Sequence, residues 1–448
     1  MKLFFIWPNI GTMMTGDRFD DKARMEPLGF AVLAGLTPKH HQISFFDDRI
    51  DRIPFDGNPD LVLISIEIFT ARRGYQIADE FRKNHVKVIL GGIHTCLMPE
   101  EASQYADSIF IGDAEQGWRE VLKDLENNQL KEKYQFTPGI AHPGIFPDKS
   151  IFKNKKYLPF SLTQFSRGCP HSCSYCAVTA YFERKIYIRK IEDVVNEINF
   201  YKKKLWFFVD DNIISNLQEA RQLFKALIPL KIKWVGQCSI DLAEDDELLD
   251  LLAKSGCIGL VIGFETIYNE SLKDLNKGPN LNIAGKYPVL IKKIHQAGVH
   301  IWAAFTLGHD FETRQSIADT LHFALKQNFA FAAFNILMPY PKTPLYDKLT
   351  LENRHLFDGK WWLAEDYHFN QAAFIPKNLE PGELTRLCRE MKVKWSSPVS
   401  IFRRFFANLN FKTIGHSLFL LRMLFLFKTE ALKKNFLMLG YFNSKPKQ

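Results

Sequence analysis

Short apolar runs alternate with amphipathic stretches along the first part of the chain. This alternation predicts parallel strands joined by helices, because a βαβ crossover places a helix between two buried strands. About five strands fall within roughly 120 residues, which is the density of a doubly wound α/β domain. The expected strands cover residues 3–7, 42–46, 61–66, 86–90 and 108–111, with helices over 27–37 and 71–84.

A second series of strand and helix units begins after residue 160 and has a longer period. Apolar strands with intervening helices predict a partial (β/α)6 barrel, in which functional residues lie at the carboxyl ends of the strands. The expected strands cover residues 162–165, 205–209, 233–239, 258–264, 300–307 and 331–337. The predicted fold class is therefore α/β, with an N-terminal doubly wound Rossmann-like domain, a partial TIM-type barrel and a helical, basic C-terminal tail.

The length of 448 residues favours more than one domain. We expect a Rossmann-like domain over residues 1–140, a barrel over 155–345 and a C-terminal region over 346–448. The proline-containing stretch over residues 137–160 is typical of a linker between the first two.

The net charge of +8 is concentrated at one end of the chain. Residues 385–448 carry 13 Lys and Arg against only Glu390 and Glu430, so this tail is strongly basic and the rest of the chain is slightly acidic. A basic end rich in Phe and Leu favours a local anionic partner such as a membrane surface over nucleic acid. The apolar run over residues 417–427 is about half of what spans a bilayer and is interrupted by Arg422. Two interpretations stay open: an amphipathic membrane anchor, and a helical subdomain packed on the barrel.

Seven cysteines are scattered without a dense framework, which indicates a reducing, cytoplasmic compartment. The apolar run at the start of the chain is far shorter than a signal-peptide core and is interpreted as a first strand. The expected location is therefore cytoplasmic, with peripheral contact to the cytoplasmic membrane left open.

Cys169, Cys173 and Cys176 form a CxxxCxxC motif directly after a predicted strand. Three thiolates in so short a segment can hold one [4Fe-4S] cluster and leave its fourth iron open. S-adenosylmethionine (SAM) can chelate that iron, so that one electron breaks a carbon–sulfur bond and yields a 5'-deoxyadenosyl radical. The alternatives are three unconnected buried thiols or a zinc site with His171, although zinc sites usually use paired CxxC spacing and no second pair lies nearby.

With this motif on a strand-end loop, the sequence resembles the radical SAM superfamily, in the branch whose N-terminal domain is similar to cobalamin-binding domains. The resemblance implies that Tyr175 packs near the adenine of SAM. It also implies that Asp210, Asp211 and Asn212 lie at the methionine amine, and that Glu265 meets the ribose hydroxyls. From the residues alone, paired aspartates after a strand also fit a helix cap, and Glu265 also fits a solvated strand end. The resemblance leaves the catalytic residues unassigned.

Four short segments resemble the cobalamin-binding domain of this branch: residues 27–29, 65, 91–95 and 99–101. The DxHxxG loop that supplies a histidine ligand in many cobalamin proteins is absent. His94 lies in Gly-Gly-Ile-His and His40-His41 precedes a strand, so neither fits that loop. A single histidine beside a glycine turn is more often structural than a ligand. Cobalamin is left open; if bound, it would make methyl transfer the expected chemistry.

We therefore predict a radical SAM enzyme that methylates or otherwise functionalises a hydrophobic or lipid-like metabolite, with an electron donor such as flavodoxin or ferredoxin. One alternative is a radical SAM enzyme that modifies RNA. Such relatives carry additional cluster cysteines in the N-terminal domain and a C-terminal β-barrel, whereas here only Cys96 precedes the motif and the end is predicted helical. No nucleic-acid partner is therefore expected. A third interpretation is a non-catalytic iron–sulfur or cofactor-binding sensor.

Overall fold

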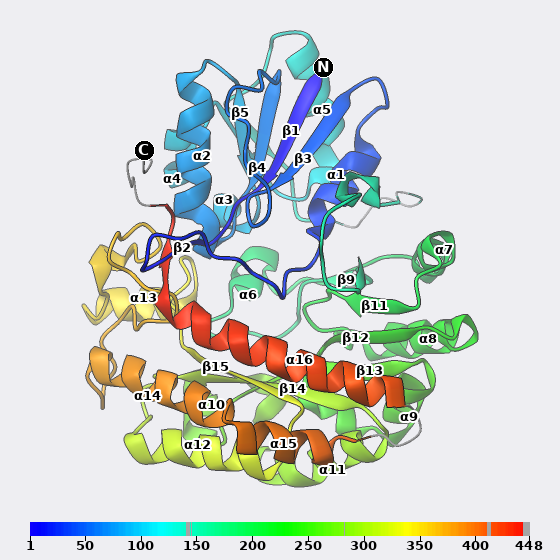
Figure 1. Cartoon of the computed structure of the whole chain (residues 1–448), viewed down its shortest axis with the longest axis vertical. Helices are drawn as coiled ribbons and strands as arrows, with labels where there is room; N and C mark the ends of the chain where they lie inside the picture. The colour runs from blue at the N-terminus through cyan, green and yellow to red at the C-terminus, as the bar shows by residue number, and fades with distance from the viewer. Residues whose placement is uncertain (140–143, 145, 282, 410–413, 442–448) are drawn as a thin grey trace. The chain divides into compact units, whose positions relative to one another are not determined.

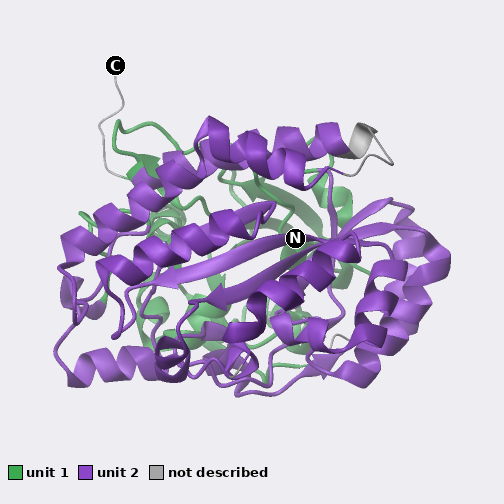
Figure 2. Cartoon of the chain, turned by 90° about the horizontal axis from the view of Figure 1, so that it is seen from below, with its two compact units in different colours: residues 1–158, 360–369, 436–448 green, residues 159–359, 370–435 purple. Residues whose placement is uncertain are grey.

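The structure is a computed structural model that describes residues 1–448 except 140–143, 145, 282, 410–413 and 442–448. The chain divides into two compact units (Figure 2). Unit 1 contains Met1–Leu158, Lys360–Phe369 and Phe436–Gln448, and unit 2 contains Pro159–Gly359 and Asn370–Asn435. Two late segments thus belong with the N-terminal unit.

Unit 1 is built on a parallel sheet of six strands in the order β3-β1-β4-β5-β6-β7. The first strands are short and almost wholly apolar, as strands covered on both faces must be. The order matches the flavodoxin-like doubly wound sheet, with its switch point between β1 and β4. The strands are β1 (Lys2–Trp7), β3 (Gln42–Asp47), β4 (Leu61–Ser65), β5 (Val88–Gly91), β6 (Ser108–Ile111) and β7 (Lys133–Gln135).

Helices cover both faces of this sheet (Figure 1). Helices α1 (Leu28–Leu36) and α5 (Ala114–Glu126) share one core with alternate strand residues such as Phe5. Helix α2 (Ala71–Lys83) packs on β4 and β5 on the other face. There the ring of Phe4 lies 6.3 Å from that of Phe81, because successive strand side chains point to opposite faces. The predicted doubly wound domain is confirmed.

Two features of unit 1 were not predicted. Strand β7 has only Tyr134 buried and carries no apolar run. Strand β2 (Gly11–Met13) pairs antiparallel with β16 (Leu437–Leu439), a pairing between the two ends of the chain that no local pattern indicates.

Unit 2 contains a second parallel sheet of six strands, in the order β15-β14-β13-β12-β11-β8. Its two edge strands do not pair with each other, so the partial (β/α)6 barrel is confirmed. The strands are β8 (Ser161–Thr163), β11 (Leu205–Phe208), β12 (Lys233–Cys238), β13 (Cys257–Glu265), β14 (His300–Leu307) and β15 (Phe331–Ile336). The crossover helices are α7 (Ile191–Tyr201), α8 (Leu217–Leu227), α9 (Asp246–Lys254), α11 (Tyr287–Gln296) and α12 (Arg314–Lys326).

Three helices of the tail belong to unit 2: α14 (Pro381–Trp395), α15 (Pro398–Ala407) and α16 (Ile414–Lys433). Ile401 and Leu424 share a small apolar cluster with Ala330 next to β15. The buried guanidinium of Arg404 donates to the carbonyl of Ala330 at 2.7 Å and lies 4.0 Å from the ring of Trp395. The inner side of the tail therefore packs on the barrel. None of the helices in the described part of the chain combines the length and hydropathy needed to cross a membrane.

Candidate active site at the cysteine loop

The cysteine loop follows β8 and a two-residue strand, β9 (Ser166–Arg167), and runs into α6 (Ala177–Phe182). Strand β9 pairs antiparallel with β10 (Tyr187–Ile188), which frames the loop. Gly168 joins β9 to Cys169 with a φ of +84°, and an added Cβ would lie 2.1 Å from the carbonyl oxygen of Lys185. Only glycine adopts this turn without strain and clash, so Gly168 sets the direction in which the cysteines leave the strand.

Cys173 is buried, and Cys169 and Cys176 are half-buried. Burial raises the pKa of the Cys173 thiol to about 11, although the nearby Lys277 ammonium opposes the shift. Burial also raises the pKa of Cys169, and the neighbouring Cys176 adds to it. A bound metal ion deprotonates such thiols, because the thiolate is the form that binds metals. The three cysteines therefore suit a cationic iron centre in a loop that is partly shielded from water.

The spacing of the cysteines along the sequence bears on which metal group they fit. Structural zinc sites usually take four ligands from paired CxxC motifs, whereas three thiolates within one short segment can hold a [4Fe-4S] cluster. The motif therefore fits a multi-iron cluster better than one zinc ion with His171.

The residues between the cysteines are held by segments far along the chain. The amide of Ser174 donates to the carbonyl of Leu275 at 2.9 Å, and its own carbonyl accepts from the amide of Leu345 at 2.9 Å. The side chain of Asn276 donates to the carbonyl and the hydroxyl of Ser172, each at 2.9 Å. These contacts fix the path of the loop.

Asp210 and Asp211 follow β11 at the carboxyl edge of the sheet, as predicted for site residues. Asp210 is fully buried and accepts hydrogen bonds from the amides of Phe165 and Ser166 and, at 2.7 Å, from the Ser166 hydroxyl. Asp211 accepts from the amide of Gly168 at 2.8 Å. Burial raises the pKa of Asp210 to about 6, although these bonds oppose the shift. Both carboxylates therefore orient the backbone that leads into Cys169.

Asn212 joins the ends of β11 and β12. Its side-chain nitrogen donates to the hydroxyl of Ser239 at 3.2 Å, and its oxygen accepts from the Ser239 amide at 3.3 Å. The contacts of Asp210, Asp211 and Asn212 with SAM stay predictions; the structure adds a role in positioning the loop.

Glu265 ends β13 with a φ of 60°, where the pairing of β13 with β14 shifts register. Its Oε1 lies 2.8 Å from the ammonium of Lys277, which in turn lies 3.3 Å from the hydroxyl of Tyr175. Left-handed backbone at a glutamate costs about 1–3 kcal/mol and is typical of functional sites. Sequence reasoning placed Tyr175 and Glu265 in the site but missed Lys277, which follows no apolar strand and carries no motif.

Comparison with known proteins agrees with this geometry. The model of the radical SAM superfamily matches residues 163–324. The bacteriochlorophyllide d C-8(2)-methyltransferase of Chlorobaculum tepidum is 32% identical over 353 residues, which cover 73% of this chain and 77% of that protein. The hopanoid C-2 methylase of Rhodopseudomonas palustris is 24% identical over 359 residues, covering 76% and 67%.

Two solved structures share the fold over most of the chain. The radical SAM methyltransferase TsrM from Kitasatospora setae superposes with a TM-score of 0.63 at 15% identity, covering 78% of this chain and 75% of that one. The cobalamin-dependent enzyme OxsB gives a TM-score of 0.67 at 12% identity, covering 94% and 72%. The chain belongs to the radical SAM superfamily, in the branch with a cobalamin-binding-like N-terminal domain. It is a radical SAM enzyme, and the cofactors of this class are a [4Fe-4S] cluster and SAM.

The carboxyl edge of the unit 1 sheet contains the segments that resemble a cobalamin site. Gly92 has a φ of +94°, and an added Cβ would lie 2.5 Å from the carbonyl oxygen of Ile66. His94 is buried, with Nε2 3.2 Å from Oε1 of Glu101. The same oxygen accepts from the indole of Trp362 at 2.9 Å. Burial raises the pKa of Glu101, but these hydrogen bonds outweigh it and lower the pKa to about 2. His94 thus has a structural partner inside unit 1, in agreement with the structural interpretation of this residue.

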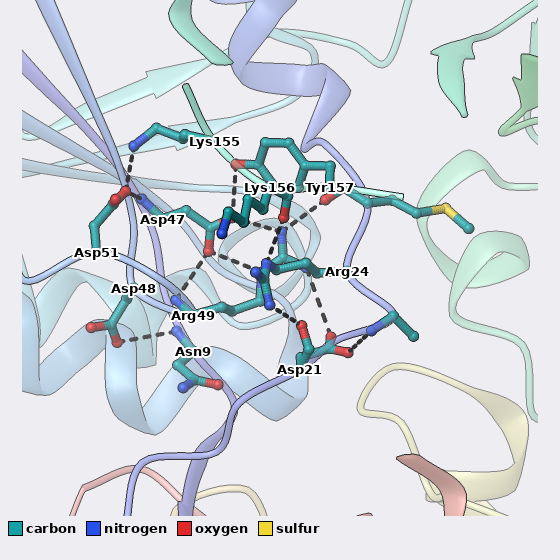
Figure 3. Close-up of polar contacts among 12 residues, drawn as sticks. Asn9, Asp21, Arg24, Asp47, Asp48, Arg49, Asp51, Lys155, Lys156 and Tyr157 are labelled. Atoms are coloured by element: carbon teal, nitrogen blue, oxygen red, sulfur yellow. Dashed lines mark hydrogen bonds and ion pairs between the residues drawn. The ribbon is translucent and has the colours of Figure 1, made fainter. Parts of the chain in front are cut away.

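A network of charges lies where β3 ends (Figure 3). Asp47 accepts from Arg49 at 2.8 Å and from the hydroxyl of Tyr157 at 2.9 Å, and Lys155 pairs with Asp51. These contacts fix residues 155–157 to unit 1 just before unit 2 begins. The carboxylates here are already neutralised by neighbouring cations, so we assign the network a structural role.

Proposed function

We propose that this chain is a cobalamin-dependent radical SAM methyltransferase that acts on a hydrophobic, lipid-like metabolite. The observation that carries the proposal is the cysteine loop at the carboxyl edge of an open parallel barrel, with its backbone held by Asp210 and Asp211. When bound, the cluster and SAM supply a radical able to abstract hydrogen from an unactivated carbon, and cobalamin supplies a methyl group.

In this proposal Cys169, Cys173 and Cys176 hold the iron. Tyr175 and Glu265, joined through Lys277, line the site for SAM. Because the pair formed by Glu265 and Lys277 is largely buried, it can present a fixed dipole to SAM without reorganisation on binding.

The proposal of cobalamin rests on the doubly wound topology of unit 1 and on the glycine turn at Gly92. Ligands of such sheets bind outside the carboxyl ends of the strands at the switch point. Because His94 is buried and bonded to Glu101, cobalamin would be held here without His94 as a ligand to cobalt. The solved structures of TsrM and OxsB contain bound cobalamin, which supports the same assignment.

Support for a hydrophobic substrate comes from the relatives, which are named for a bacteriochlorophyllide and for a hopanoid. A second line of support is the outer face of the tail. The exposed rings of Phe402 and Phe425 lie 6.4 Å apart, beside the exposed Arg403 and Arg422. Further exposed apolar side chains on α15 and α16 are Val399, Phe406 and Leu418. Aromatic and basic side chains on one helical face suit an anionic membrane surface, where such a substrate would be taken up.

The proposal is tested by anaerobic incubation of the cluster-loaded enzyme with hydroxocobalamin, a reductant and SAM that carries a deuterated methyl group. The substrate pool is the lipid extract, the pigment extract or, separately, the RNA of a strain that lacks the gene. We expect the label in one hydrophobic compound, with S-adenosylhomocysteine and 5'-deoxyadenosine formed alongside. Label in RNA would instead favour the RNA-modifying alternative, and SAM cleavage without label in any extract would contradict methyl transfer.

A further inference from the structure

Two adjacent histidines and one glutamate converge at the amino edge of the unit 1 sheet. His40 and His41 end the loop between α1 and β3, and Glu126 is the last residue of α5. Nε2 of His40 and Nε2 of His41 each lie 3.3 Å from the same oxygen, Oε1 of Glu126. Among the described residues, these three side chains are the only trio of potential metal ligands whose ligand atoms all lie within 4.8 Å of one another.

The distances match those around a bound metal ion. In a tetrahedral zinc site with bonds of about 2.0–2.1 Å to nitrogen and oxygen, neighbouring ligand atoms lie about 3.3 Å apart. Both nitrogen-to-oxygen separations have this value. All three ligand atoms lie within 4.8 Å of one another, so one ion is within reach of all of them.

The position of Glu126 also favours a cation. Glu126 occupies the final position of α5, where the helix dipole disfavours a negative charge by about 0.3–1 kcal/mol. A cation at Glu126 offsets that cost.

The ligands differ in accessibility in a way that suits an exchangeable ion. The His41 side chain is 1% exposed, and its Nδ1 lies 3.4 Å from the N-terminal ammonium of Met1. The side chains of His40 and Glu126 are 66% and 44% exposed. One ligand is thus fixed by the core, and the other two leave the remaining coordination positions open to water.

We propose that His40, His41 and Glu126 form a binding site for one divalent transition-metal ion of the zinc class, which tethers the loop before β3 to the end of α5. Two imidazoles and one carboxylate suit zinc, nickel or copper better than magnesium or calcium. The site lies at the opposite end of β3 from the carboxyl edge, about 20 Å away for six strand residues. It is therefore separate from the proposed cobalamin site and stabilises unit 1 without taking part in the reaction.

The test is equilibrium dialysis of the full-length, cluster-loaded chain, without a histidine tag, against zinc-buffered solution, followed by zinc and iron analysis. The variants are His40→Ala and Glu126→Gln, whose side chains are exposed enough for the fold to tolerate the change. The matched control is His85→Asn, an exposed histidine of the same unit with a φ of 59°, a conformation that asparagine accepts.

We expect native protein and His85→Asn to retain one zinc more than either ligand variant at equal iron content. We also expect the dissociation constant for zinc to rise roughly tenfold or more in the two variants. Equal zinc in native protein and both variants would overturn the proposal, and so would an equal loss in His85→Asn.

Discussion

The ammonium of Lys277 lies 2.8 Å from Oε1 of Glu265 at the end of β13. Only 15% and 8% of these two side chains are exposed, so the pair is held largely away from water. Removing one member of a buried pair leaves an uncompensated charge and costs about 3–5 kcal/mol, whereas replacing both can be nearly neutral. The stability of this part of the site is therefore sensitive to the loss of either charge alone.

We predict that Glu265→Gln and Lys277→Met each lower the free energy of unfolding of unit 2 by about 3–5 kcal/mol. The double variant should lose clearly less free energy of unfolding than the sum of the losses of the two single variants, because neither charge is then left without its partner. Urea titration of the four proteins measures the coupling. Additive losses would show that the two side chains do not depend on each other.

Gly263 makes room for this pair. An added Cβ there would lie 2.5 Å from Oε1 of Glu265 and 2.9 Å from the Lys277 ammonium. At Gly259, on the same strand, the nearest atom would be 3.4 Å away, which is an ordinary contact. We therefore predict that Gly263→Ala displaces the pair, destabilises unit 2 by about 1–3 kcal/mol and raises the KM for SAM. Gly259→Ala should change the stability of unit 2 and the KM for SAM only slightly. Equal effects of the two variants would contradict this explanation.

Asp210 should give unit 2 an unusual dependence on pH. Burial raises its pKa from 3.8 to about 6 in the folded chain. Between these values the unfolded chain has already lost the proton that the folded chain keeps, so the free energy of unfolding falls as pH rises. The drop totals about 3 kcal/mol, of which about 2 kcal/mol falls between pH 4 and pH 6, and it is complete about one pH unit above the folded pKa.

Asp210→Asn does not titrate and supplies the control. We predict that native protein loses stability relative to Asp210→Asn as pH rises from about 4 to about 6. Denaturant midpoints of the iron-free chains measure the difference, so that acid loss of the cluster does not enter. A constant difference across this range would mean that Asp210 titrates at an ordinary pKa.

The cysteine loop could be predicted because its three thiols lie in one short segment directly after an apolar strand. The strand-end positions of Asp211 and Glu265 followed from the barrel pattern in the same way. The partners of these acids could not be predicted, because Asp211 bonds to the amide of Gly168 and Glu265 to Lys277, pairs made by tertiary packing. The pairing of β2 with β16 was missed for the same reason.

The outer face of the tail should bind anionic vesicles. We predict that the double variant Arg403→Glu/Arg422→Glu lowers vesicle binding by roughly an order of magnitude or more, because each basic residue near such a surface contributes about 1 kcal/mol. Phe402→Ser/Phe406→Ser should also weaken binding, since both rings are exposed. Co-sedimentation with phosphatidylglycerol vesicles at low and high salt measures the effect.

The matched control for this face is Phe200→Ser, which removes an equally exposed ring from α7. It should leave vesicle binding unchanged. If Phe200→Ser weakens binding as much as the tail variants, or if native protein stays in the supernatant, the tail has no role at membranes.

The central claim is that Cys169, Cys173 and Cys176 hold the cluster that cleaves SAM. Its most direct test is to reconstitute native protein, Cys176→Ala and Cys238→Ala anaerobically, and to measure iron and the products of SAM cleavage. Cys238 is a buried thiol of β12 outside the motif and serves as the control. We predict about four iron atoms per chain and SAM cleavage in native protein and Cys238→Ala, and loss of both in Cys176→Ala. An iron-loaded native protein that forms neither 5'-deoxyadenosine nor S-adenosylhomocysteine, or a Cys176→Ala variant as active as native protein, would contradict the claim.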